Sequence, residues 1–150
     1  MKFDLKAMTF CIIGGDRRQL ELIKLIKEKH GNVKVLGFPK EEIESPFPVL
    51  EDCDCIYENL CEDALYGDII YLPIPYKDKN GFVNMKYSNL RIQWDDILPY
   101  IRHGSIVMLG KEDKHICNTA KQHGIHIHDI VNMEEFSITN AIPSAEGAIQ

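Results

Sequence analysis

Two adjacent arginines stand where a short apolar run gives way to a helical pattern, and they are well suited to binding an anion. Arg17 and Arg18 directly follow Gly14-Gly15-Asp16. Cations in a first helical turn oppose the helix macrodipole, and local rules tend to be broken at functional sites. Because guanidinium groups beside helix N–H groups suit a carboxylate or a phosphate, we expect at least one of them, with Arg18 ahead of Arg17, to hold an anionic ligand. The alternative is that both side chains point into solvent.

Asp16 has a structural and a catalytic interpretation. An Asp at the N-cap position with Gln19 three residues later fits a capping box, in which each side chain satisfies a backbone N–H group. We favour this capping role over a catalytic one. The segment 14–19 also departs from the G-x-G-x-x-G pattern, and bulky side chains at its small-residue positions keep a pyrophosphate off the backbone. We therefore expect no cofactor-binding residues within this chain.

Short apolar runs alternate with helical patterns, which is typical of an α/β sheet. The expected strands are 9–13, 33–37, 68–72, 105–109 and 125–128. The expected helices are 17–30, 57–66, 94–101 and 112–123, with a small hairpin at the Asn-Gly turn in 77–83 and an irregular, proline-containing segment at 38–54. We predict an open, doubly wound, mostly parallel sheet in a flavodoxin-like or Rossmann-like three-layer sandwich. In such folds the ligand crevice lies at the carboxyl ends of the strands, so loops 14–18, 72–76 and 109–111 should meet there.

Composition argues against several classes of partner. The chain has 150 residues, enough for one domain with its own hydrophobic core. A net charge of −6 argues against nucleic-acid binding, which usually needs a basic surface. No apolar run approaches the ~18 residues of a membrane span, and the N-terminus lacks a signal-peptide pattern. We therefore expect a cytoplasmic location.

Two sets of side chains could bind a metal, and for each we favour a simpler interpretation. Cysteines 53, 55 and 61 cluster, but their spacing lacks the paired C-x-x-C of structural zinc sites, so plain thiols are favoured. His126 and His128 share one face of an expected strand and lie beside Asp129. An edge strand with one solvent-facing side produces the same pattern. We predict no metal site.

The last residues have the sequence pattern of a helix start. Pro143 suits a first helical turn, and the residues after it favour helix continuation. We therefore expect residues 1–139 to form an N-terminal α/β domain and 140–150 to start a helix that connects it to a further domain.

Three segments together resemble the A subunit of dipicolinate synthase: residues 12–21, Ile70-Tyr71-Leu72-Pro73, and residues 140–149. The G-G-D-x-R-Q opening and the I-P-x-x-E-G-x-I close are fairly specific as a pair. That family is similar in build to 2-hydroxyacid dehydrogenases. The resemblance implies an oxidoreductase of spore formation in the mother cell, which makes dipicolinate from the dihydrodipicolinate branch of lysine biosynthesis together with a flavoprotein-like B subunit. It implies NAD(P) bound by the further domain, and activity of the two-domain subunit rather than of these residues alone.

The resemblance also implies a dicarboxylate substrate with a ring nitrogen, bound at the cleft between the two domains. The candidate substrate-binding residues are Gly15, Asp16, Arg17, Arg18, Pro73 and Ser144. Glu146, in the closing motif, is the candidate catalytic residue, orienting the substrate or accepting a proton; it could equally support the first turn of the connecting helix. The rival hypothesis is a non-catalytic assembly or regulatory flavodoxin-like module that docks a partner subunit, and a homo-oligomer is compatible with either.

Overall fold

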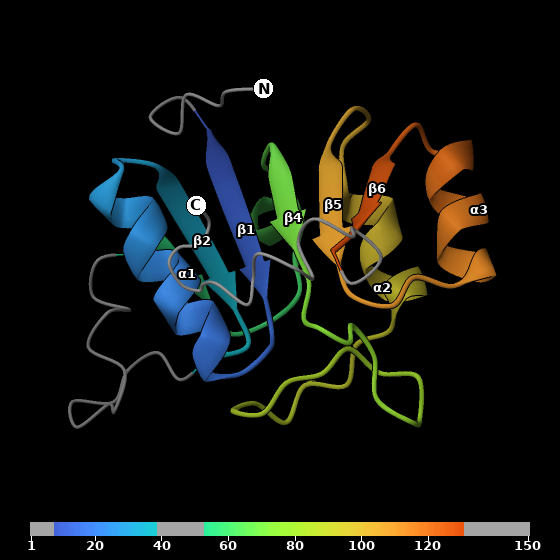
Figure 1. The fold of residues 1–150 in the computed structure, drawn as a ribbon, viewed down its shortest axis with the longest axis horizontal. Helices are drawn as coiled ribbons and strands as arrows, with labels where there is room; N and C mark the ends of the chain where they lie inside the picture. Colours follow the sequence, from blue (N-terminus) through green and yellow to red (C-terminus); the bar gives the residue numbers. More distant parts are fainter. Residues whose placement is uncertain (1–7, 39–52, 131–150) are drawn as a thin grey trace.

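A computed structural model of the chain describes residues 8–38 and 53–130, which form a parallel sheet flanked by helices (Figure 1). The strands of this part of the chain are β1 (Thr9–Ile13), β2 (Asn32–Leu36), β3 (Cys55–Tyr57), β4 (Ile69–Tyr71), β5 (Ile106–Leu109) and β6 (His126–Asp129). They lie in the order β3-β2-β1-β4-β5-β6, and every neighbouring pair is parallel. This is the strand order of Rossmann folds, so the predicted α/β class and doubly wound sheet are confirmed.

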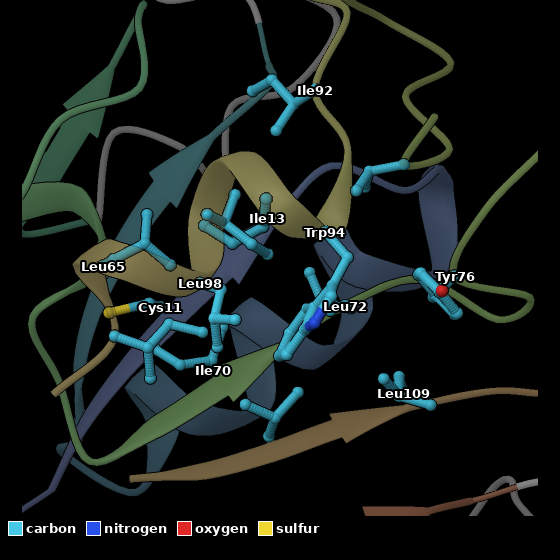
Figure 2. Packing of buried hydrophobic residues seen from close by; sticks show 14 of the residues in the cluster. Cys11, Ile13, Leu65, Ile70, Leu72, Tyr76, Ile92, Trp94, Leu98 and Leu109 are labelled. Atoms are coloured by element: carbon cyan, nitrogen blue, oxygen red, sulfur yellow. The ribbon is translucent and has the colours of Figure 1, made fainter. Parts of the chain in front are cut away.

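Helices cover both faces of the sheet, and alternate side chains of the strands feed two separate cores. On one face, α1 (Arg17–Glu28) packs its apolar stripe against β1 and β2. On the other face lie α2 (Trp94–Ile97), α3 (Lys114–Gln122) and two short 3-10 turns, η3 (Asp63–Leu65) and η4 (Leu98–Tyr100). Figure 2 shows this second core, where Trp94 packs beside Leu72. Trp94 is 3% exposed and donates its indole N–H to Thr119 Oγ1 at 2.8 Å, so its packing role is confirmed.

Helix α1 begins as its sequence predicts and ends two residues early. Asp16 caps its first turn, and Lys29 is its C-cap. The residue that enters the left-handed region is His30, with φ of +66°, rather than the glycine that follows it. The Gly31 N–H then donates to Ile26 O at 3.0 Å and satisfies one of the last carbonyls of the helix.

The helix expected at 112–123 is shortened slightly, to Lys114–Gln122, while two other predicted helices differ more strongly from the structure. Residues 57–66 are not a helix: Tyr57 ends strand β3, where it pairs with Leu36, and only Asp63–Leu65 makes a 3-10 turn. A three-residue strand is too short to show an alternating pattern, which is why the sequence does not reveal β3. The helix expected at 94–101 has a single α turn followed by η4. Pro99 has no N–H to continue the α-helical ladder, so the last turn tightens.

The predicted hairpin is present. Lys77 and Val83 form an isolated antiparallel bridge, and the Asp78 N–H donates to Phe82 O at 2.7 Å. Gly81 has φ of +90°, which suits the turn. We call residues 77–86 the flap. Among the described residues no helix is both long and apolar enough to cross a membrane.

Candidate functional site

The main candidate site is a hollow at the point where the sheet reverses its winding. Strands β1 and β4 are neighbours there, and the helices that follow them lie on opposite faces of the sheet, which is where doubly wound folds bind ligands. The hollow has a volume of about 370 Å³. Three segments line it, namely the β1–α1 loop, the loop after β4, and the flap; the lining residues are Gly15, Asp16, Arg18, Pro73, Ile74, Pro75, Asp78, Asn84, Met85 and Lys86.

The third predicted loop, 109–111, supports the site instead of lining it. The Tyr76 N–H donates to Gly110 O at 3.0 Å, and the Gly110 N–H donates to Pro73 O at 3.3 Å. These bonds hold the loop after β4 against the end of β5. The expectation that all three loops reach the crevice is therefore only partly right, because the loop after β5 is used to brace its neighbour.

Gly14 and Gly15 allow the flap to reach the end of β1. The Gly15 N–H donates to Asn84 O at 2.8 Å, and Gly15 O accepts from the Lys86 N–H at 3.1 Å, so the flap pairs with this loop as a short parallel bridge. Gly14 has φ of +66°, and a Cβ there would lie 2.6 Å from Asn84 O. A side chain at Gly14 would therefore push the flap away from the hollow.

Asp16 forms the predicted capping box. Its carboxylate Oδ1 accepts from the Arg18 N–H at 2.9 Å, and the Asp16 N–H donates to Gln19 Oε1 at 2.7 Å. Gln19 is 3% exposed, so this arrangement is held between the loop and the core. The carboxylate of Asp16 thus lies where an external anion would bind the helix N-terminus.

Arg18 lies along the wall of the hollow and is fixed at two points. Its Nε and Nη2 each donate to the Asp16 carboxylate at 3.1 Å, and Nη2 also donates to Ile74 O at 2.9 Å. The side chain is still 64% exposed, and within the described residues Nη1 donates no hydrogen bond. The hydrogen bond from Arg18 lowers the pKa of Asp16, and Asp16 raises the pKa of Arg18. The pair therefore stays ionised, with one edge of the guanidinium facing solvent.

Arg17 and Arg18 are not equivalent. Arg17 is exposed and is not among the residues that line the hollow, whereas Arg18 contacts both the helix cap and the loop after β4. Adjacent positions on a helix point about 100° apart, so the two side chains leave α1 in different directions. Tyr71, at the end of β4, lies close enough to Arg18 for the guanidinium charge to oppose the rise in its pKa that burial causes.

Several lining residues were not predicted from the sequence. Asn84, Met85 and Lys86 come from the flap, where no apolar periodicity marks them. Asn84 holds the flap in place, because its side-chain amide donates to Pro75 O at 2.8 Å and its N–H donates to Tyr76 O at 3.0 Å. The Asn-Gly turn earlier in the flap was the only available signal, and it indicates a hairpin without saying where the hairpin packs.

A second set of polar contacts ties the base of the flap to α3. Asp113 caps α3 by accepting from the Ile116 N–H at 2.9 Å, and it also accepts from the Tyr76 hydroxyl at 2.8 Å and from Lys77 Nζ at 2.8 Å. Burial acts to raise the pKa of Asp113, but the hydrogen bonds from Lys77, from Ile116 and from Tyr76 outweigh it and lower the pKa to about 2. Burial and the bond to Asp113 raise the pKa of Tyr76.

The candidate metal ligands do not gather. His126 and His128 are both exposed on β6, the edge strand of the described sheet, which agrees with the edge-strand interpretation. Asp129 turns away and accepts the N–H groups of Lys111 and Glu112. The described residues contain no group of three His, Cys, Asp or Glu side chains that could hold a metal ion. The cysteines form no disulfide, and burial raises the pKa of Cys11 to about 12.

Two candidate site residues, Ser144 and Glu146, lie outside the described residues, as does the expected connecting helix at 140–150. The part of the predicted site that the structure describes is therefore Gly15, Asp16, Arg18 and Pro73 around one hollow, with Arg17 beside it.

Comparison with known proteins supports one family. The family that comprises the N-terminal domain of the dipicolinate synthase A subunit matches residues 9–131. The A subunit of dipicolinate synthase from Bacillus subtilis (strain 168) is 26% identical over 147 residues, which are 97% of this chain and 47% of that protein. This chain therefore spans about half the length of that curated relative.

Solved structures give the same fold. The crystal structure of the dipicolinate synthase A subunit from Bacillus subtilis superposes with a TM-score of 0.70 at 24% identity, over 96% of this chain and 46% of that one. D-lactate dehydrogenase from Aquifex aeolicus, solved with NAD and lactic acid, gives a TM-score of 0.58 at 18% identity, over 99% of this chain and 42% of that one. At these identities the likeness shows the fold, which is that of a dehydrogenase-like α/β domain.

Proposed function

Since the chain belongs to the family of N-terminal domains of dipicolinate synthase A subunits, we propose that it is the substrate-side domain of an NAD(P)-dependent oxidoreductase that makes dipicolinate during sporulation. The observation that carries this proposal is the placement of Arg18 on the hollow at the β1–β4 switch point. A dicarboxylate can bind there through a charge-assisted hydrogen bond from the outer edge of that guanidinium.

The chemistry of the hollow fits orientation of a substrate. Arg18 is held by Asp16 and by Ile74 O, so its free edge keeps one direction without the entropy loss of ordering a mobile side chain. Pro73 and Pro75 add a wall with few N–H donors, against which a planar ring can lie. We propose that Ser144 and Glu146 complete the site from the other side of the cleft, with Glu146 orienting the substrate or accepting a proton.

The β1–α1 turn does not fit a dinucleotide. The Asp16 carboxylate lies at the helix N-terminus, where a pyrophosphate would have to bind, and a carboxylate repels phosphate. Gln19 fills the space next to Gly15, where a third glycine of the nucleotide motif would leave room. We therefore propose that NAD(P) supplies its redox chemistry from the further domain of the full-length protein. We also propose that the partner of that protein is the B subunit of dipicolinate synthase, in the cytoplasm of the mother cell.

Calorimetry of the 150-residue chain tests this proposal. Dipicolinate titrated into the chain should release or absorb heat with a saturating isotherm, while NADPH should give none. The ligand and protein are prepared in chelator-treated buffer, because dipicolinate binds divalent cations. If dipicolinate fails to bind at millimolar concentration, the non-catalytic docking module becomes the better explanation. If NADPH binds instead, the proposal that the further domain binds the nucleotide is wrong.

A further inference from the structure

Two cationic side chains line the hollow, and they differ in whether they already form an ion pair. Arg18 forms an ion pair with Asp16 at 3.1 Å and donates to Ile74 O. Lys86 is exposed, and within the described part of the chain its ammonium forms no ion pair and no hydrogen bond; its contact is with the Tyr87 ring, whose centroid lies 5.8 Å from Nζ. Exposed cation–π contacts are weak, so this ammonium remains available.

The acidic side chains of the hollow are already engaged. Asp16 is paired with Arg18 and caps α1. Asp78 accepts the N–H groups of Asn80 and Phe82 inside the turn of the flap, at 2.8 and 3.0 Å. The described lining of the hollow thus has two acidic and two basic side chains, and Lys86 is the basic one that forms no ion pair.

The position of Lys86 is set by the fold. Its N–H donates to Gly15 O at 3.1 Å, the adjacent Met85 pairs with Gly15, and Asn84 O accepts the Gly15 N–H. The start of the Lys86 side chain is therefore tied to the same glycine pair that begins the loop before α1, the helix on which Arg18 lies. The charge of Lys86 also reaches that loop: the hydrogen bond from Arg18 is the largest cause of the lowered pKa of Asp16, and the charge of Lys86 adds a smaller effect in the same direction.

We propose that Lys86 is the second anchor of the hollow and binds the second carboxylate of the dicarboxylate, while Arg18 binds the first. This inference rests on the function proposed above and adds the residue that distinguishes a dicarboxylate from a monocarboxylate. Arg18 supplies a rigid edge, and Lys86 supplies a mobile point charge on a four-carbon stem. A ligand with one carboxylate satisfies Arg18 and leaves Lys86 in water; a ligand with two carboxylates engages both.

The test compares two ligands with three proteins. Pyridine-2,6-dicarboxylate and pyridine-2-carboxylate, which differ by one carboxylate, are titrated into the wild-type chain, into Lys86→Gln and into Lys24→Gln. Lys24 is an exposed lysine on α1 that does not line the hollow, so its variant controls for the loss of one surface charge. Lys86→Gln should weaken binding of the dicarboxylate by about tenfold and should barely affect the monocarboxylate. Lys24→Gln should change neither affinity.

Two results would reject the proposed role of Lys86 and leave the proposed function standing. One is an unchanged affinity of Lys86→Gln for the dicarboxylate; the other is an equal loss for both ligands, which would indicate a general effect of charge. An unfolding curve for each variant checks that it folds, and Lys86 is exposed, so little change is expected. If the wild-type chain binds neither ligand, the proposed function itself fails, and the role of Lys86 fails with it.

Discussion

Arg18 donates two hydrogen bonds of 3.1 Å to the carboxylate of Asp16, the residue that caps the helix on which Arg18 lies. This pairing explains how a helix without acidic residues in its first turn tolerates an arginine there. The carboxylate of Asp16 interacts favourably both with the positive end of the helix dipole and with the Nε and Nη2 groups of Arg18. In the proposed function, an anionic ligand therefore binds at the remaining Nη1 of Arg18 and not at the helix N-terminus, which the Asp16 carboxylate already occupies.

The two arginines provide a matched pair of variants. We expect Arg18→Gln to weaken dipicolinate binding by about tenfold or more, because it removes a charge-assisted hydrogen bond at the hollow. Arg17→Gln removes the same charge from a side chain that does not line the hollow, and should change affinity by no more than about twofold. Calorimetry at fixed ionic strength measures both. Equal losses would mean that overall charge, rather than the geometry of Arg18, controls binding.

Replacing Asp16, the residue that caps α1, should lower the free energy of unfolding. Asp16→Ala removes the side chain that caps α1 and should lower the free energy of unfolding by about 1 kcal/mol. Asp16→Asn keeps an oxygen that can cap the helix and loses only the exposed ion pair with Arg18, so it should cost less, about 0.5 kcal/mol. Urea unfolding followed by circular dichroism gives both values. A loss for Asn as large as that for Ala would assign the stability to the ion pair.

Asp113 should make the fold sensitive to acid. Its folded-state pKa of about 2 lies below its ordinary value of 3.8. The ionised carboxylate therefore stabilises the folded state fully at pH values above its ordinary pKa. This stabilisation is lost as the pH falls from about 4 to about 2, and we expect it to be about 1 kcal/mol because the side chain is 30% exposed.

The matched variant for this prediction is Asp113→Asn, which can still cap α3 but cannot titrate. Urea midpoints measured at several pH values should fall less steeply for Asn than for the wild type within that window. Parallel curves would show that the contacts of Asp113 with Lys77 and Tyr76 contribute nothing to acid stability.

Gly14 should tolerate substitution worse than another glycine with positive φ. Gly14→Ala places a Cβ 2.6 Å from the backbone oxygen of Asn84 and should cost about 2 kcal/mol or more. Gly104 has φ of +92°, but a Cβ added there would meet no described atom within 4 Å, so Gly104→Ala should cost about 1 kcal/mol from backbone strain alone. The excess at Gly14 measures how closely the flap approaches. Equal losses in urea unfolding would contradict the contact between the flap and β1.

The sequence alone determined the features whose signals are local. The buried run at Thr9–Ile13 and the capping box of α1 depend on residues within a few positions of each other, and both were predicted. Alternation of strands and helices was sufficient to predict the parallel sheet, because a parallel pair requires a crossover. The location of the crevice then followed from general rules about such sheets.

Tertiary structure decided which of these residues meet. The bond from Arg18 to Ile74 O spans 56 residues, and it separates Arg18 from the otherwise similar Arg17. Strand β3 exists through its pairing with β2, since its own three residues carry too little pattern to predict it. Lys86 reaches the hollow because two glycines let a distant hairpin approach the end of β1. Each of these contacts joins segments that are distant in the sequence and become neighbours only when the chain folds. A pattern of neighbouring residues therefore does not predict them.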